Sequence, residues 1–377
     1  MSSKKPIVVF GATGAQGGGL ARAILNDPDS EFSVRAFTRN VNSEKAKELA
    51  RSGAELFSGD IDNVASVYKA LEDAYGAYFV TFYWAHFSPE KEKEEAATYS
   101  KAAKAVALKH AIWSTLEDTR EYIPLTDNRM PTLMGKYKVP HFDGKGESDK
   151  LFTEAHVPTT FLHASFYWDN FIFFGLGPKR GADGKLALTL PIGKAKMAGI
   201  SAEDIGKCAY SIFKRDGELI AKTVGVAGEY LTGDEMAKTL SKTLGEKVSY
   251  NNIPASVFRS FGFPGAEDVG NMFQFYEEFE KELNTIRDAK LTKELNPELQ
   301  SFEEWLSKNA KRIVTKHEKN QIAPFLITLI IHCMIISRSF NGYNSQSRCS
   351  AKSFANAFTS EGHSKRTTPY QKETGCE

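Results

Sequence analysis

The chain has 377 residues, 41% of them hydrophobic and 12% aromatic, which is enough apolar material for the cores of about two domains. Its formal net charge of +1 excludes a strongly basic protein, so we expect no direct attraction to nucleic acid or to an acidic membrane surface. Cys208 is the one cysteine in the first 330 residues, which excludes an internal disulfide there and favours a reducing compartment.

The amino-terminal residues 1–6 are polar, and the apolar run that follows is too short for the core of a signal peptide. We expect a cytoplasmic protein, with the nucleus as a second location.

The first apolar run, residues 7–10, breaks into glycines spaced GxxGxxG at Gly11, Gly14 and Gly17. Four consecutive apolar residues suit a strand buried on both faces, and the glycines let the backbone approach a ligand that a Cβ would exclude. A helix that begins near Gly17 would direct free N–H groups and its positive dipole end at phosphates. The pattern predicts the first βα unit of a dinucleotide-binding fold; the alternative is a glycine turn that only ends a strand.

The second apolar run, residues 34–38, begins after about one helix length and closes a βαβ unit. An acidic residue after it would bind the ribose hydroxyls of NAD, but the chain has Arg39, with Lys45 and Lys47 further on. Because a guanidinium matches a 2′-phosphate, we predict NADP(H) rather than NAD(H). The alternative is that Arg39 is an ordinary solvated arginine.

Further strands are predicted where apolar runs recur, at residues 54–57, 77–82, 111–114 and 159–163. Residues 64–74 and 89–109 between them have helical spacing with charged outer faces. This alternation predicts an α/β fold with a doubly wound parallel sheet, whose ligands bind at the carboxyl ends of the strands.

Polar residues follow several of these strand ends. Asp60 can accept a hydrogen bond from the adenine amino group or can cap the next helix, and the residues leave both readings open. We expect the nicotinamide ribose to lie along the backbone at the end of the fourth strand, which carries Thr81, Phe82 and Tyr83. Ser114 and Thr115 end the fifth strand.

The second half of the chain is rich in aromatic residues. The run 166–174 either lines a substrate pocket or packs in a core, and we favour core packing. The spacing of Met272, Phe273, Tyr276, Phe279 and Leu283 predicts one apolar helix face. A capping box, Ser301 with Glu304, predicts a last amphipathic helix.

Residues 322–336 are strongly apolar and are followed by a serine-rich tail, which we expect to be disordered. Fifteen residues are fewer than the roughly 20 needed to span a bilayer, so a membrane anchor is the less favoured interpretation of this segment. The preferred one is an extension of uncertain biological origin, such as altered splicing or a gene-model error.

Together these residues resemble the NmrA-like family, within the atypical short-chain dehydrogenase/reductases, and in particular its HSCARG-type redox-sensor branch. The resemblance covers about residues 5–312 and rests on motifs in the expected order, at positions 10–18, 38–40, 59–60, 80–84, 141–147, 262–266 and 271–276.

The resemblance implies a Rossmann-type fold with a smaller C-terminal α/β region. We divide the chain into a nucleotide-binding core at residues 1–160, the remaining NmrA-like region at 161–314, which includes the last core strands, and a non-family tail at 315–377. By resemblance the NADP(H) contacts are Gly11, Thr13, Gly14, Ala15, Gln16, Gly17, Arg39, Asn40, Ser43, Asp60, Ile61, Thr81, Phe82, Tyr83, Lys145, Tyr167, Trp168, Asp169 and Asn170.

The catalytic prediction depends on one substitution. Active short-chain dehydrogenases use Tyr-x-x-x-Lys on a helix, where the lysine lowers the tyrosine pKa. Here Lys145 is present, but His141 occupies the tyrosine position. His141 could donate the proton, hydrogen-bond the loop before the helix, or lie exposed without a role. Tyr137 is too distant, about two turns away if the segment is helical.

Two functions follow. The first is an NADP(H)-binding redox sensor that has regulatory protein partners by family analogy, can form a homodimer, and binds no metal. The second is an NADPH-dependent reductase of a small carbonyl or quinone, in which His141 or water supplies the proton; the catalytic candidates are Lys145 and His141. The missing tyrosine favours the sensor.

Overall fold

The computed structural model of the protein describes residues 4–313. A seven-stranded sheet runs through them in the order β11-β6-β5-β4-β1-β2-β3, and each neighbouring pair is parallel. Its strands are β1 (Lys5–Phe10), β2 (Phe32–Thr38), β3 (Glu55–Ser58), β4 (Gly76–Phe79), β5 (His110–Thr115), β6 (Thr159–His163) and β11 (Thr223–Gly225). This confirms the predicted fold class.

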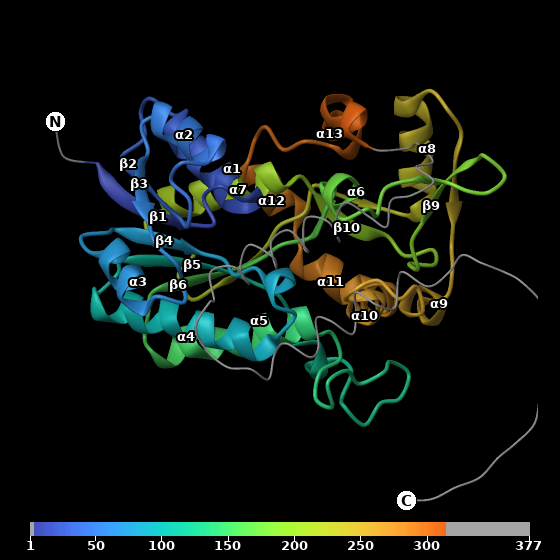
Figure 1. Cartoon of the computed structure of the whole chain (residues 1–377), viewed down its shortest axis with the longest axis horizontal. Coiled ribbons are helices and arrows are strands. Elements are labelled where there is room, and N and C mark those ends of the chain that lie inside the picture. Colours follow the sequence, from blue (N-terminus) through green and yellow to red (C-terminus); the bar gives the residue numbers. More distant parts are fainter. Residues whose placement is uncertain (1–3, 314–377) are drawn as a thin grey trace, which may run out of the picture. The chain divides into compact units, whose positions relative to one another are not determined.

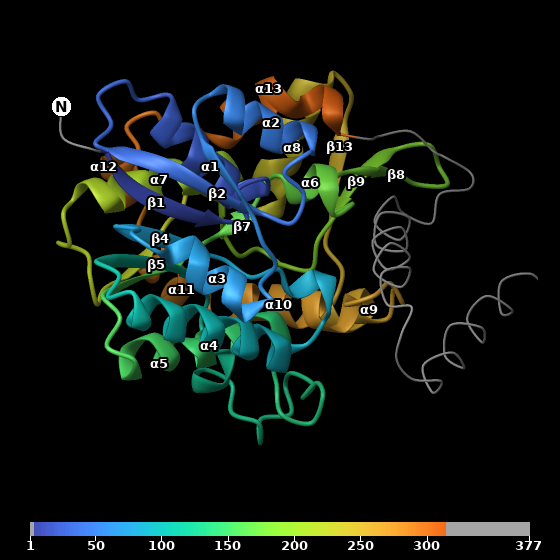
Figure 2. The ribbon, with the colours of Figure 1, turned by 60° about the vertical axis from the view of Figure 1, so that its left-hand side comes forward.

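Helices cover both faces of this sheet (Figures 1 and 2). One face packs against α1 (Ala15–Leu25), α7 (Ala202–Lys214) and α12 (Ala289–Leu295), with α2 (Glu44–Arg51) beside β2 and β3. The other packs against α3 (Val64–Leu71), α4 (Pro89–Ala105) and α5 (Pro140–Glu154). Alternate residues of a strand face opposite sides, so Ile7 joins the first cluster and Val8 the second.

Glycines let α1 and α7 approach closely. A Cβ on Gly206 would lie 2.1 Å from the backbone nitrogen of Leu20, and one on Gly19 would lie 2.8 Å from the carbonyl oxygen of Glu203. Neither contact is compatible with a larger side chain. The contact fixes α1, the helix that follows the glycine motif, against the sheet.

The remaining described residues form two three-stranded sheets and several helices. One sheet contains β7 (Phe166–Tyr167), β10 (Met197–Ile200) and β12 (Glu229–Leu231), and the other contains β8 (Lys179–Arg180), β9 (Leu186–Thr189) and β13 (Val248–Asn251). The helices are α6 (Asn170–Phe173), α8 (Gly233–Leu244), α9 (Ala255–Arg259), α10 (Ala266–Glu278), α11 (Glu280–Ile286) and α13 (Phe302–Asn309). Short 3-10 helices lie at η1 (Tyr83–Ala85), η2 (Thr119–Glu121) and η3 (Ala310–Arg312).

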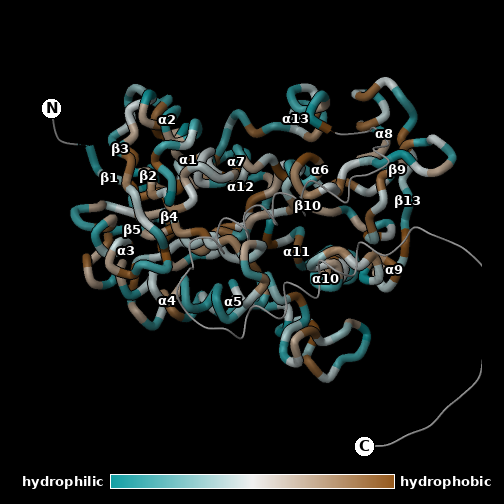
Figure 3. Tube along the Cα trace, in the orientation of Figure 1, coloured by the Kyte–Doolittle hydropathy of each residue, from teal (hydrophilic) through white to brown (hydrophobic). Residues whose placement is uncertain are grey.

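The core of this second region is aromatic. Phe166, Trp168 and Phe171 are buried in it, together with Trp305 of α13, so the core-packing interpretation of these three residues is confirmed. Phe173 is 55% exposed and belongs to no core. In Figure 3 apolar residues mark the strands, whereas α4 carries long hydrophilic stretches.

Most predicted elements are present, but several end earlier than predicted. The helix at α3 ends at Leu71 and that at α4 ends at Ala105, because Asp73 and Ala107 adopt positive φ angles of 59° and 50°. The capping box of Ser301 and Glu304 is confirmed at the start of α13.

Two predictions about continuity are wrong. The strand predicted to reach residue 82 ends at Phe79, where the chain bends so that Thr81 hydrogen-bonds Glu92 of α4. The single helix predicted through Leu283 is broken at Phe279, whose φ of −119° and ψ of 31° are not helical. The Phe279 ring packs on Phe275 and Tyr122 instead.

The predictions for the tail lie outside the described residues. Within residues 4–313, no helix has the length and apolar character needed to cross a bilayer.

Candidate functional site

The glycine motif forms a cradle between β1 and α1. Gly11 has a φ of +66°, which favours glycine, and its carbonyl oxygen accepts a hydrogen bond from the Gly14 N–H at 2.8 Å. A Cβ on Gly17 would lie 2.5 Å from the same oxygen. No side chain of the described residues caps α1, and its first backbone bond runs from Gly18 to Gly14 at 3.2 Å. The amides of residues 15–17, between these two bonds, are therefore available to an anion, which fits a pyrophosphate.

Two cations lie at the edge of this cradle. Arg39 follows β2, is exposed, and has no hydrogen-bond or ion-pair partner among residues 4–313. The Lys45 ammonium, from α2, donates to the Thr13 carbonyl oxygen at 3.4 Å. Asn40 and Ser43 shape the turn between them, because Asn40 accepts from the Asn42 N–H and Ser43 caps α2.

Asp60 does not cap the following helix. Its carboxylate accepts from the Asp62 N–H at 3.1 Å, whereas Asn63 caps α3 by accepting from Ser66. The capping alternative for Asp60 is therefore wrong, because α3 begins four residues after it. Ile61 packs at the edge of the core on this face of the sheet.

Gln16 turns inward to the carboxyl ends of three strands. Its Oε1 accepts from the Ser114 hydroxyl at 2.9 Å and from Tyr78, and its Nε2 donates to Tyr167. Burial raises the pKa of Tyr78 and of Tyr167, so both hydroxyls stay protonated. The network joins α1 to β4, β5 and β7.

Lys145 is held on the inner side of α5. Its ammonium lies 2.7 Å from Glu92 Oε2 and donates to Thr81 Oγ1, which itself donates to the same carboxylate at 2.7 Å. The Lys145 side chain is 12% exposed and Glu92 is fully buried. Phe82, next to Thr81, is 57% exposed, and Tyr83 is buried in η1.

His141 is buried and binds the second region. Its Nδ1 lies 2.6 Å from Asp268 Oδ1 of α10, and its backbone N–H donates to Oδ2 at 3.2 Å. The alternatives of an exposed ring and of a bond to the preceding loop are therefore both wrong. Burial first, and then Asp268, raises the pKa of Tyr83, whose ring centroid is 5.8 Å from that of His141.

Tyr137 lies before α5 rather than in it, and its hydroxyl donates to Glu90 at 2.8 Å. The long segment around it packs on α10, where the Asn271 amide donates to the Pro131 carbonyl at 2.9 Å. The Tyr137 hydroxyl therefore hydrogen-bonds Glu90 and does not contact Lys145.

The loop after β6 is fixed to the core. Tyr167 lies in β7, Trp168 packs on Phe302 with ring centroids 5.4 Å apart, and Asp169 accepts from the Ala202 N–H at 3.0 Å. Asn170 begins α6.

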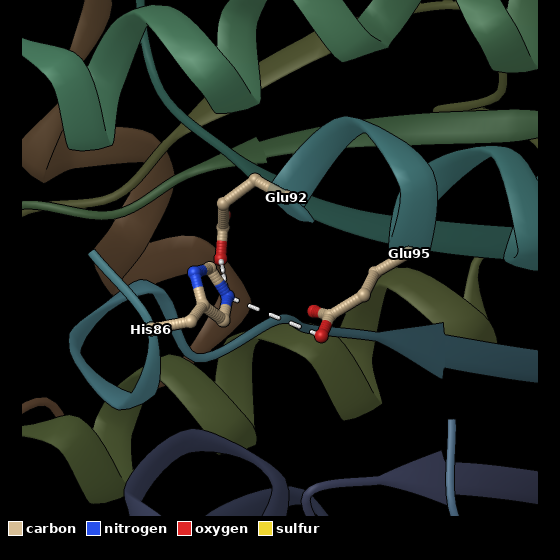
Figure 4. Close-up of side chains that lie close together, drawn as sticks. All are labelled: His86, Glu92 and Glu95. Atoms are coloured by element: carbon tan, nitrogen blue, oxygen red, sulfur yellow. Dashed lines mark ion pairs between the residues drawn. The ribbon is translucent and has the colours of Figure 1, made fainter. Parts of the chain in front are cut away.

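A cluster not predicted from the sequence lies beside Lys145, which pairs with Glu92. Figure 4 shows its three side chains, His86, Glu92 and Glu95. His86 Nε2 is 3.7 Å from Glu92 Oε1 and 4.0 Å from Glu95 Oε1. These are residue types found in metal sites, but His86 Nδ1 accepts from the Ser88 N–H at 3.1 Å. In a neutral ring the hydrogen is then on Nε2, which faces the carboxylates but has no hydrogen-bond partner among the described residues, so in this tautomer Nε2 offers no lone pair to a metal.

A separate cavity of about 1000 Å³ lies beside the other side of α5, with Glu117, Asp149 and His163 in its lining. Buried Arg287 pairs with Glu117 at 2.8 Å. Although burial alone would raise it, the pKa of Glu117 is held below its usual value by this guanidinium. None of the predicted site residues lines this cavity.

Comparison with known proteins agrees with the motifs. The NmrA-like family model matches residues 3–306. An NmrA-like family domain-containing protein of Dictyostelium discoideum is 28% identical over 313 residues, covering 81% of this chain and 97% of that protein. An NmrA-like family domain-containing oxidoreductase of Malbranchea aurantiaca is 27% identical over 336 residues, covering 82% and 98%. The crystal structure of NmrA, a negative transcriptional regulator, in complex with NADP has the same fold, with a TM-score of 0.66 at 21% identity, covering 81% of this chain and 95% of that chain.

Proposed function

This chain belongs to the NmrA-like family, as its motifs predicted, and from that premise we propose that it is an NADP(H)-binding redox sensor without robust dehydrogenase activity. The cradle at Gly11 and Gly17 would receive the pyrophosphate. Arg39 and Lys45 would hold the 2′-phosphate, and Lys145 the nicotinamide ribose. The NADP complex of the structurally similar regulator NmrA supports NADP(H) binding, and because a complex of the same regulator with NAD is also known, the preference over NAD(H) rests on Arg39 alone.

The observation that carries the sensor interpretation is the partner of His141. At the position where active dehydrogenases place a tyrosine, its ring is buried and bound to Asp268. The nearby Tyr137 hydroxyl is bonded to Glu90. Tyr137 is therefore not free to protonate a substrate beside Lys145, and His141 could do so only through Nε2, since Nδ1 is bound to Asp268. A bound cofactor would then act by favouring one conformation, since a ligand with equal affinity for both shifts nothing.

Calorimetry and a turnover assay test this proposal together. We expect the purified chain to bind NADPH and NADP⁺ more tightly than NADH, and to leave NADPH unoxidised with a panel of carbonyls and quinones. Absence of binding heat with both NADPH and NADP⁺ would end the proposal. Regulatory protein partners and a homodimer are further parts of this proposal, and they rest on family analogy only.

A second candidate function is an NADPH-dependent reductase of a small carbonyl or quinone. It is favoured by the retained Lys145 and by the name oxidoreductase of the Malbranchea relative. If turnover is found, Lys145→Ala should abolish it while NADPH binding persists. Lys150→Ala, on an exposed position of the same helix, is the matched control.

A further inference from the structure

Glu95 and Glu92 lie close to each other on α4 and both face the His86 ring (Figure 4). Glu92 is fully buried, and its Oε1 has no hydrogen-bond partner among the described residues. Its other oxygen binds Lys145 and Thr81. A buried carboxylate oxygen without a hydrogen bond is costly, which marks the space between the three side chains as functionally important.

The cluster connects the protein surface with Lys145. Glu95 lines a small surface pocket of about 160 Å³, beside Lys91 and Thr98. From there the carboxylate faces His86, His86 faces Glu92, and Glu92 holds the Lys145 ammonium. A change of charge at Glu95 is therefore transmitted to the ammonium through groups with little access to water.

Glu95 is the member of the cluster whose charge changes near neutral pH. Burial, and then the Glu92 carboxylate, raise the pKa of Glu95 to about 7, while burial lowers the pKa of His86. The other ionisable groups around Glu95 come from the same helix, the loop after β3 and α5, namely Lys91, Glu94, Tyr99, Asp60, Asp62 and Lys145.

We propose that Glu95, acting through His86 and Glu92, determines which redox form of NADP the site prefers. The proposal rests on the proposed function, because it requires the nicotinamide to lie beside Lys145. The oxidised nicotinamide ring carries a positive charge and the reduced ring is neutral. An ionised Glu95 therefore stabilises bound NADP⁺ relative to NADPH, and a protonated Glu95 does not. By linkage, NADP⁺ must in turn release more protons from the cluster on binding than NADPH does.

The test is the ratio of the NADPH and NADP⁺ dissociation constants, measured by calorimetry on the full chain at pH 6 and pH 8.5. The 2′-phosphate ionises in both nucleotides and cancels in the ratio. We expect the preference to move toward NADP⁺ by about fivefold over this range. Glu95→Gln should keep at both pH values the ratio that the wild type has at pH 6. Glu94→Gln, an exposed neighbour, should move as the wild type does.

A second measurement uses the wild type alone, so it does not depend on the folding of a variant. Binding heats in buffers of different ionisation enthalpy give the protons released at pH 7, and we expect more with NADP⁺ than with NADPH. Equal proton numbers, or a wild-type ratio that is constant with pH, would overturn the inference while leaving NADP(H) binding intact. If neither nucleotide binds, the proposed function fails and this inference fails with it.

Discussion

At Gly17 the glycine loop and α1 come so close that any side chain must move the backbone. A Cβ there would lie 2.5 Å from the Gly11 carbonyl oxygen and 2.8 Å from that of Phe10. We expect Gly17→Ala to lower the free energy of unfolding by about 1–3 kcal/mol, measured by urea denaturation. NADPH binding should weaken as well, because the amides at the start of α1 are displaced. Gly18→Ala, whose Cβ would meet no atom nearer than 3.1 Å, should cost less in both measurements.

Arg39 has no partner in the described structure and so is free for a phosphate. A charge-assisted pair with a 2′-phosphate contributes about 1.5–3 kcal/mol, so Arg39→Ala should weaken NADPH binding at least about tenfold. NADH binding should change little, since NADH has no such phosphate. Arg51→Ala, at the far end of α2, is the control for loss of one positive charge. Equal losses for NADPH and NADH would contradict the role given to Arg39.

Residues whose role depends on a local pattern could be predicted from the sequence, and residues whose partners are distant could not. Gly11 and Gly14 belong to the GxxGxxG spacing, which by itself predicted the glycine loop after the first strand. Glu92, by contrast, stands among other acidic residues of a charged helix, and nothing local distinguishes it from exposed Glu94. Its burial follows from where α5 packs on α4, which a single sequence does not reveal.

At the scale of elements, one carboxylate joins α5 to α10. Asp268 accepts from both the ring and the backbone N–H of His141. Asp268→Asn removes the charge and one acceptor, so we expect the free energy of unfolding to fall by about 1–2 kcal/mol. For a folded part of this size the melting temperature should then drop by about 1.5–3 °C in a thermal scan. Glu267→Gln, on an exposed neighbouring residue, should melt with the wild type. An unchanged melting temperature for Asp268→Asn would mean that this contact does not stabilise the pair of helices.

Periodicity located most elements of the large sheet but not where they end. A strand ends where tertiary contacts change the direction of its backbone. Beyond β4, for example, the Thr81 hydroxyl donates to Glu92 and the strand does not continue. The apolar face predicted through Leu283 is buried as expected, but Phe279 packs sideways and divides the helix. Hydrophobic spacing records which residues are buried and does not record a break in the backbone.

At the scale of the whole molecule, the alternation of strands and helices was sufficient to predict the parallel sheet, because each crossover places neighbours by a general rule. No comparable rule predicts the order of the strands in the second region. Its β9 pairs with β13, which follows after several intervening elements, and β8 and β7 have two residues each. Strands that short carry no recognisable alternation, so this region could be predicted only as a smaller α/β part.

The stability of the whole molecule should depend on pH through its buried acids. Burial raises the pKa of Asp149 to about 7 and that of Asp143 to about 6. The folded protein holds these protons more tightly than the unfolded chain, so the stability they contribute is complete below about pH 4 and is lost as pH rises to about 7. Glu117, with its lowered pKa, loses its contribution only in acid, outside this range. His110 acts in the opposite direction, because burial lowers its pKa to about 4.

These opposing groups make the total pH profile a poor test, whereas the difference between two variants isolates one acid. Asp149→Asn removes a titrating group that accepts from Trp113 at 2.9 Å and from Thr115 at 2.6 Å. A hydrogen bond lost in Asp149→Asn lowers the unfolding free energy of this variant equally at every pH. Only the change of the unfolding free energy with pH therefore reports the ionisation of Asp149. Between pH 5 and 8 we expect the wild type to lose about 1–3 kcal/mol more than Asp149→Asn in urea denaturation. Glu154→Gln, exposed on the same helix, should follow the wild type. If the unfolding free energies of all three proteins change with pH in parallel, Asp149 does not change its ionisation between pH 5 and pH 8. The prediction would then be wrong.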